Sequence, residues 1–467
     1  MSLSCKKEKA MKTFTSRYPD FKVYPESVQE KDGNFFFLAK KATEKYLVVG
    51  KDSFRFLPLN KEAVALLQET FPWLKPTVCG LKNSFGFGDR IGLATPGHLQ
   101  ALCGYDFFPV LAQQSPRELE RTGRTFSDVL TSAVIGAFQA GYRGGFGADA
   151  DHLKTIPHLK QALDAGFTFF TIDPSEKIRK PAQLSEAERK TQLHAKFPEL
   201  EKIYLGRKYR FDRKTLEFTR ENLTDLVLTY CPALDFIEKC YQTARSYAGS
   251  FDFEVSVDET SLPTTPLAHI FIVDQLCRRK IEFQSLALRL PGRFEKGIDY
   301  LGNLQTLEKA LKIHQRIREA LGPYKISLHS GSDKFSVYPI FRRVLGRCFH
   351  VKTSGTSWIE AIKTAAGVDF DFFLGVLQRG FKDFRENCAG YEISSKPEGL
   401  RPEILQKKII AEIFSDNTIR QVIHISYGSI LSDLTFREKL FHILRVNEEK
   451  HYRSLARHLR RHLRLLS

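Results

Sequence analysis

Residues 325–355 read KISLHSGSDKFSVYPIFRRVLGRCFHVKTSG, and the pattern in this stretch decides the fold. Apolar runs at residues 325–328 and 348–351 have the length of buried strands, and the segment 335–345 between them has the spacing of a helix. Parallel strands need a crossover of this kind, so a strand, a helix and a strand in this order predict one parallel β–α–β unit.

The same alternation of strand and helix occupies most of the chain. We predict six further strands before this unit, at residues 84–88, 108–112, 145–148, 167–172, 251–257 and 285–290. Helices are predicted between them, among others at residues 157–165, 266–278 and 304–320. Eight alternating units favour an α/β fold, a (β/α)8 TIM-type barrel, over an open doubly wound sheet.

The regions around these units have other patterns. Residues 1–75 contain three short strand-like runs and one capped helix, which predicts a small N-terminal α/β cap. The barrel is then expected to span residues 76–355. Within it, residues 174–250 are too long for an ordinary connection and are predicted to form a helical insertion over the barrel mouth. Residues 356–467 are predicted to form a mostly helical C-terminal extension.

Composition restricts the class of protein. The 467 residues are 42% hydrophobic and 27% charged, as in an ordinary globular protein. No run of about 18 apolar residues predicts a membrane span, and the first residues do not resemble a secretory signal. The eight cysteines form no Cys-x-x-Cys pair, which favours reduced cysteines in a cytoplasmic protein.

The formal net charge of +17 raises the question of a nucleic-acid partner. Basic residues cluster at 205–214 and again at 453–464. The second cluster has leucines at helical spacing, which favours a solvated helix docked by its leucine edge over a site for nucleic acid. A positive field can also attract small anionic substrates, and this is the use we expect.

Three histidines stand in the same relation to three predicted strands. His152, His329 and His350 lie at or just beyond the ends of the third, seventh and eighth strands. The carboxyl ends of barrel strands meet at one mouth. Three neutral imidazoles there suit a divalent metal cation with an open coordination position, such as Zn, Ni, Mn or Co. The alternative is that each histidine is a structural residue hydrogen-bonded to a neighbour.

Carboxylates occur at the ends of two predicted strands, and one of these strands also carries a histidine. Asp151 precedes His152, and Asp258 and Glu259 close the fifth strand. A pair of carboxylates facing across a bound sugar can act as base and acid. Capping of loops is the alternative role for these side chains.

Two segments are candidates for binding an anion. Residues 353–357 follow the eighth strand and open a helix, so free N–H groups near Ser354 and Thr356 can bind an oxyanion, with charge added by Lys334 and Lys352. The glycine-rich segment 84–90 ends in Arg90. Neither is a full phosphate or dinucleotide motif, and an ordinary capped turn is the alternative.

These segments resemble the tagaturonate epimerase family, whose members use a divalent metal to interconvert D-tagaturonate and D-fructuronate. The matching stretches are residues 84–98, 148–152, 257–260, 328–334 and 350–358. The resemblance implies a metal held by His152, His329 and His350, with Asp151 as proton acceptor and Glu259 as proton donor. Asp258 stays open as the alternative donor.

The expected substrate is a small anionic sugar acid, and a homo-oligomer stays open. We predict that the substrate contacts Arg90, Asp258, Lys334, Lys352, Ser354 and Thr356. The carbon that inverts bears a hydroxyl group and lies β to a ketone, so removal of an α-proton does not invert it. A retro-aldol cleavage followed by aldol closure does, with a metal stabilising the enediolate.

Other function classes remain possible from the sequence alone. A different metal-dependent barrel enzyme acting on sugars, such as a class II aldolase or a ketose isomerase, would share the metal site. A non-catalytic protein that binds anions or nucleic acid would use the basic surface for binding, and the three histidines would then have only structural roles. A transient oxidation is not expected, because no Gly-x-Gly-x-x-Gly unit follows a strand.

Overall fold

Eight parallel strands close into a barrel at the centre of the molecule. The computed structural model describes residues 3–211, 214–247, 249–260, 262–397 and 409–467. In barrel order the strands are β6 (Ser84–Phe87), β7 (Phe108–Gln114), β8 (Gly147–Leu153), β9 (Phe169–Ile172), β12 (Asp252–Val257), β13 (Ser285–Leu288), β14 (Lys325–Leu328) and β15 (Phe349–Thr353). The pairing of His350 with Ser84 joins β15 to β6 and closes the ring. The predicted (β/α)8 barrel is confirmed.

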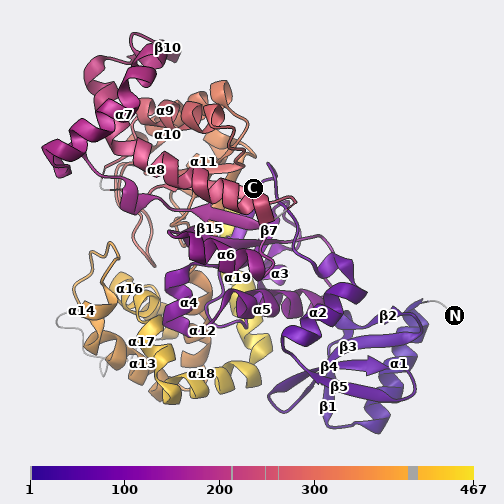
Figure 1. The fold of residues 1–467 in the computed structure, drawn as a ribbon. Helices are drawn as coiled ribbons and strands as arrows, with labels where there is room; N and C mark the ends of the chain where they lie inside the picture. The colour runs from indigo at the N-terminus through magenta and orange to yellow at the C-terminus, as the bar shows by residue number, and fades with distance from the viewer. Residues whose placement is uncertain (1–2, 212–213, 248, 261, 398–408) are drawn as a thin grey trace.

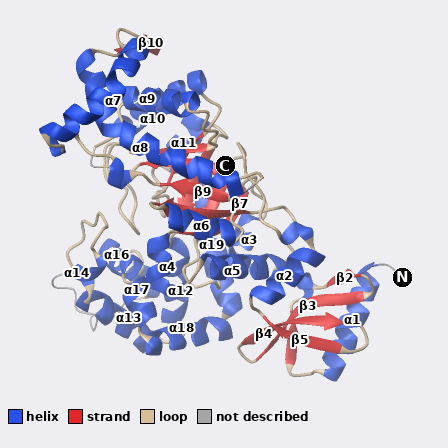
Figure 2. Ribbon diagram, in the orientation of Figure 1, coloured by secondary structure: helices blue, strands red, loops and turns tan. Residues whose placement is uncertain are grey.

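Helices cover the outside of the barrel, and they surround the red strands at the centre of Figure 2. They are α3 (Thr95–Leu102), α4 (Pro116–Thr122), α5 (Phe126–Gln139), α6 (Ile156–Asp164), α9 (Pro266–Arg278), α10 (Leu304–Leu321) and α11 (Tyr338–Leu345). The predicted bounds of α9 are confirmed, because the Thr265 hydroxyl accepts a hydrogen bond from Ala268 N and Pro266 occupies the first turn. Every residue of β12, β13, β14 and β15 is buried, as expected for covered parallel strands.

An antiparallel sheet precedes the barrel. It consists of β1 (Phe21–Val23), β2 (Gln29–Lys31), β3 (Asn34–Lys41), β4 (Glu44–Gly50) and β5 (Phe54–Pro58), with α1 (Leu3–Arg17), α2 (Lys61–Thr70) and the short turns η1 (Pro25–Ser27) and η2 (Pro72–Leu74). Phe14 of α1 packs against aromatic residues of the sheet, and α2 contacts α5 of the barrel. The predicted α/β cap is present. The three-residue strands β1 and β2 are too short to have a sequence pattern.

The insertion after the fourth barrel strand differs from the prediction in two ways. It contains η3 (Ser175–Lys177), η4 (Pro181–Gln183), α7 (Glu186–Tyr204), β10 (Lys208–Phe211), β11 (Lys214–Glu217) and α8 (Arg220–Tyr247). It therefore includes a β-hairpin in addition to helices. The long helix α8 packs against α6 and α9, and the hairpin contacts α9 and α10. The predicted position over the barrel mouth is therefore wrong for α8 and the hairpin. Both lie against the outer helices of the barrel, because the apolar side chains of α8 and of the hairpin pack against those helices.

The C-terminal region is helical, as predicted. Its helices are α12 (Thr356–Ala366), α13 (Phe370–Lys382), α14 (Phe384–Asn387), α15 (Ile410–Ile413), α16 (Asn417–Ile425), α17 (Tyr427–Ser432), α18 (Leu434–Val446) and α19 (Glu448–Leu466). Most of them share a separate apolar core. Leu455, Leu459, Leu463 and Leu466 of α19 are buried, and this helix packs along α3, α11 and α12, which confirms the predicted docking. Figure 1 shows the cap and the insertion at opposite ends of the molecule, with the barrel between them.

One buried ion-pair network ties the C-terminal helices to the barrel. Asp333, in the loop after β14, pairs with Arg420 of α16 at 2.6 Å and with His458 of α19. The backbone N–H of Asp333 donates to His462 Nε2 at 3.1 Å. Among the helices that the structure describes, none is both long and apolar enough to cross a membrane.

Candidate metal centre

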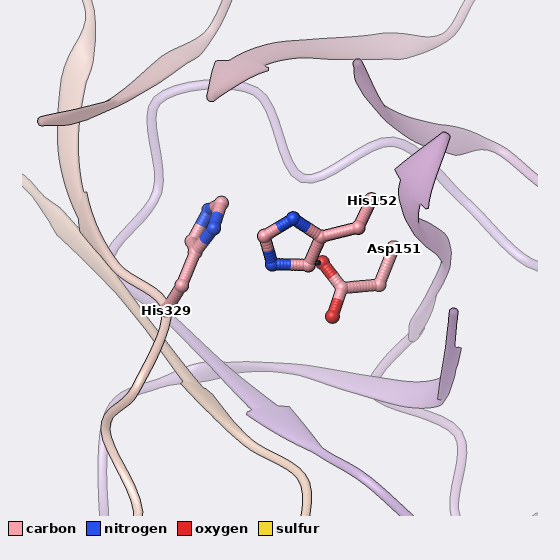
Figure 3. A group of neighbouring side chains, drawn as sticks. All are labelled: Asp151, His152 and His329. Carbon is pink, nitrogen blue, oxygen red and sulfur yellow. Dashed lines mark ion pairs between the residues drawn. The ribbon is translucent and has the colours of Figure 1, made fainter. Parts of the chain in front are cut away.

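Two predicted ligands and the predicted base meet at the mouth of the barrel. Ligand atoms of Asp151, His152 and His329 all lie within 4.8 Å of one another, and Figure 3 shows the two imidazole rings next to each other, one seen face-on and the other edge-on, with the carboxylate beside His152. Neighbouring strand residues normally point to opposite faces. His152, however, has a left-handed φ of 51°, and the register of β8 against β9 shifts between Ala150 and Leu153. This irregularity lets Asp151 and His152 face the same space.

Each of the two imidazoles is held by a buried carboxylate. His152 Nδ1 lies 3.0 Å from Asp173 Oδ2, and His329 Nε2 lies 2.6 Å from Glu254 Oε1. The other ring nitrogen of His329 is buried and makes no hydrogen bond to the residues that the structure describes; it lies 3.3 Å from Asp258 Oδ1. Metal-ligating histidines are oriented by outer carboxylates in this way. Nε2 of His152 and Nδ1 of His329, the ring nitrogens that these carboxylates leave free, can therefore bind a divalent cation.

The carboxylates around the two rings make them strongly basic. Burial alone lowers the pKa of His152, but Asp151 and Asp173 outweigh it and raise this pKa to about 10. Burial also opposes the charge on His329, but Asp258 leads the groups that raise its pKa to about 9. Both rings therefore hold an extra proton when no metal is present. A divalent cation can replace these two protons and compensate the same negative charges.

Lys352 lies inside the barrel and holds Asp151 in place. Its Nζ is 2.9 Å from Asp151 Oδ1, 2.7 Å from Asp149 Oδ2 and 2.8 Å from Glu254 Oε1. Burial raises the pKa of Asp151, but Lys352 and the nearby imidazoles reverse this and lower it to about 2. Asp151 is thus ionised at neutral pH. The position of Lys352 supports a role in orienting Asp151, whereas the sequence predicted contact with substrate.

His350 points into the barrel at a deeper level than the other two histidines. It lies two residues before Lys352 on β15, and two residues span about 6.6 Å along a strand. Its Nδ1 is 2.9 Å from Ser84 Oγ, and its ring lies 5.4 Å from that of Phe169. Its Nε2 makes no hydrogen bond within the described part of the chain. The structure does not bring His350 into the group formed by Asp151, His152 and His329.

The two carboxylates after β12 both border this group. Asp258 Oδ1 lies 3.3 Å from His329 Nδ1, and the Ser256 hydroxyl donates a hydrogen bond to the Asp258 carboxylate. Glu259 is more exposed and pairs with Lys154 at 3.0 Å. Glu259 also lies near His152 and Asp173, so the predicted donor is at the edge of the site.

The residues predicted to bind the substrate anion are mostly engaged elsewhere. Arg90 is buried, pairs with Glu118 at 2.9 Å and lies 3.8 Å from the centre of the Tyr427 ring. Lys334 is buried and donates to three backbone carbonyl oxygens. Ser354 is half-buried before α12. Thr356 begins α12, and its buried hydroxyl makes no hydrogen bond to the described residues.

Asp173 and Glu254 are two residues of the site that were not predicted from the sequence. The available signal was an acidic residue inside an otherwise apolar buried strand, as in Phe253-Glu254-Val255. Buried carboxylates are rare unless they are paired, so such a residue indicates a partner inside the barrel.

Comparisons with known proteins agree with this architecture. Residues 24–466 match the family model described as tagaturonate epimerase. A curated Thermotoga maritima protein, named tagaturonate/fructuronate epimerase, is 44% identical over 471 residues, which cover 96% of this chain and 97% of that protein. The glycerol-complexed structure of fructuronate-tagaturonate epimerase from Cohnella laeviribosi superposes with a TM-score of 0.91 at 34% identity, covering 98% of this chain and 99% of that one. The native structure of that enzyme gives 0.90 at 35% identity over the same shares. This chain therefore belongs to the tagaturonate epimerase family.

Proposed function

We propose that this protein is an epimerase that interconverts D-tagaturonate and D-fructuronate with a bound divalent metal ion. The observation that carries the proposal is the pair of carboxylate-held imidazoles, His152 and His329, facing Asp151 at the barrel mouth. The family and the named relatives supply the substrate.

His152 and His329 are the two metal ligands that the geometry favours. Asp258 is the best placed third ligand, because its Oδ1 lies 3.3 Å from the free nitrogen of His329. His350, the third ligand predicted from the sequence, faces Ser84 and would need its ring to move. Metal analysis of the Asp258→Asn and His350→Ala variants distinguishes these two assignments.

The reaction begins with proton transfer to Asp151. Lys352 keeps this carboxylate ionised, so it can accept the proton of the hydroxyl group on the carbon that inverts. The bond from this carbon to its neighbour on the ketone side opens. The electron pair stays on the ketone fragment as an enediolate, and the other fragment becomes an aldehyde. A divalent cation at this site supplies Lewis-acid stabilisation of negative charge on oxygen.

The second half of the reaction rebuilds the bond with the opposite configuration. The aldehyde rotates, the carbon–carbon bond closes on its other face, and Glu259 donates a proton to the new hydroxyl oxygen. The proton on Asp151 then passes to solvent, and one from solvent returns to Glu259, so both carboxyl groups are restored. The exposed position of Glu259 at the edge of the site, near His152, supports its role as the donor.

The test is turnover of D-tagaturonate by purified protein of known metal content. NMR should show D-fructuronate as the product, with loss of turnover after chelation and recovery when a divalent cation is restored. Released three-carbon fragments would instead indicate an aldolase, and a shifted carbonyl would indicate an isomerase. Unchanged turnover in protein shown to be metal-free would contradict the metal assignment.

A further inference from the structure

The loop between β13 and α10 presents Lys296 on a backbone that is fixed from several sides. The side chains that hold it come from the loop after β14 and from α16. The hydrogen bonds run from Lys334 Nζ to the carbonyl oxygens of Glu295 (2.8 Å) and Ile298 (2.5 Å), from Arg420 Nε to that of Gly297 (2.7 Å), and from Gln421 Nε2 to that of Lys296 (3.3 Å). Binding groups held on such a fixed backbone lose little entropy when a ligand arrives.

The ammonium group of Lys296 contacts the residue that follows a proposed metal ligand in the chain. Its Nζ donates to Ser330 Oγ at 3.1 Å, and Ser330 directly follows the proposed ligand His329. The side chain is half-buried. Lys296 therefore places a positive charge at the mouth on the side where His329 enters it.

No ion pair between Lys296 and an acidic residue is found in the described part of the chain, and its ammonium group is only half-buried. Four other cations at this end of the barrel do have carboxylate partners: Lys154 with Asp173 and Glu259, Arg289 with Glu392, Arg293 with Glu295, and Lys352 with Asp149, Asp151 and Glu254. Lys334 has no carboxylate partner among the described residues either, but its ammonium group is buried and donates to three backbone carbonyl oxygens. An unpaired cation in a partly buried position favours an anionic ligand.

We propose that Lys296, together with the hydroxyl of Ser330, binds the carboxylate of the sugar-acid substrate. The proposal rests on the function proposed above, since it assigns the group that recognises the acid end of a uronate. A lysine ammonium is a compact positive charge, and together with a hydroxyl donor it can bind a carboxylate without the paired, parallel hydrogen bonds that an arginine forms. Lys334 is then a positioning residue, because its bonds to Glu295 and Ile298 fix the loop that carries Lys296.

The test compares Lys296→Met, Lys296→Arg and a charge-matched control, Lys312→Met, all with measured metal content. Lys312 is exposed on the outer face of α10 and pairs with Glu308. Loss of one charge-assisted hydrogen bond should raise the KM for D-tagaturonate about 10- to 150-fold in Lys296→Met. Metal content and kcat should stay close to wild type, Lys296→Arg should recover most of the affinity, and Lys312→Met should behave as wild type.

Several results would overturn this assignment. An unchanged KM in Lys296→Met, or a fall in kcat alone, would remove Lys296 from carboxylate recognition. Loss of metal or of folded protein in both Lys296 variants would indicate a structural role. Wild-type protein that binds D-tagaturonate in calorimetry without converting it would contradict the proposed function only. Weaker binding by Lys296→Met in the same experiment would still support the carboxylate site.

Discussion

Metal binding at the barrel mouth should release about two protons per ion at neutral pH. The pKa values of His152 and His329 are raised to about 10 and about 9, so at pH 7 each ring is about 99% protonated or more. Both protons must leave before the rings can bind a metal. Asp151, with its pKa lowered to about 2, is already ionised and releases none. Two histidines with the ordinary pKa of 6.5 would release only about 0.5 proton together.

The sign of the pH effect follows directly. At any pH below its raised pKa, each imidazole is mostly protonated, and the proton competes with the metal ion for the ring nitrogen. The affinity of the site for the metal ion therefore rises with pH. Between pH 6 and pH 7 the dissociation constant should fall about 100-fold, tenfold for each proton.

Calorimetric titration of metal-free protein with Zn²⁺ measures the proton count directly. The titration is repeated at pH 7 in buffers of different ionisation enthalpy, and the dependence of the measured heat on that enthalpy is the number of protons released. Asp173→Asn removes a carboxylate that raises the pKa of His152, so it should release fewer protons and bind the ion about 10- to 100-fold more weakly. A release of about 0.5 proton or less by wild-type protein would refute the reasoning.

Four further predictions follow from the same contacts. His329→Ala removes a proposed ligand, so both metal content and turnover should fall sharply, and full metal occupancy with normal turnover would exclude His329 from the site. Asp151→Asn cannot accept a proton, so turnover should drop ~10²–10⁴-fold with metal retained, and loss of metal would instead make Asp151 a ligand. Turnover in D₂O should leave no deuterium on the inverted carbon, since the retro-aldol route exchanges only a hydroxyl proton; NMR detection of deuterium there would contradict that route. Asp333→Ala removes the buried carboxylate that pairs with half-buried Arg420 and His458, so urea unfolding should show a loss of about 3 kcal/mol, the lower end of the range for a broken buried pair, whereas unchanged stability would show that the ion pair contributes nothing.

The sequence predicted the barrel well because its determinants are local. The spacing of apolar residues separates strands from helices, and the order of the elements then leaves few topologies. Thr265 and Pro266 marked the start of α9, and the leucines of α19 marked the face that docks. The insertion was harder to predict, because its helical pattern does not say which neighbouring surface its apolar face covers.

The candidate site was only partly predictable. Chain order indicated that Asp151, His152 and His329 lie at strand ends, which converge in any parallel barrel. That Asp151 and His152 face the same space depends on the positive φ of His152 and on a register shift, which the chain adopts only when β8 packs against β9.

Only the tertiary structure determined how deep each side chain lies inside the barrel and which side chains pair across it. The stagger of the strands places His350 beside Ser84 of β6, and no single strand sequence contains that information. The same holds for Arg90 and Lys334, whose partners come from segments far away in the chain. The sequence by itself determined which residues reach the carboxyl ends of the strands. Only closure of the barrel determined which of them meet, because that depends on contacts between strands distant in sequence.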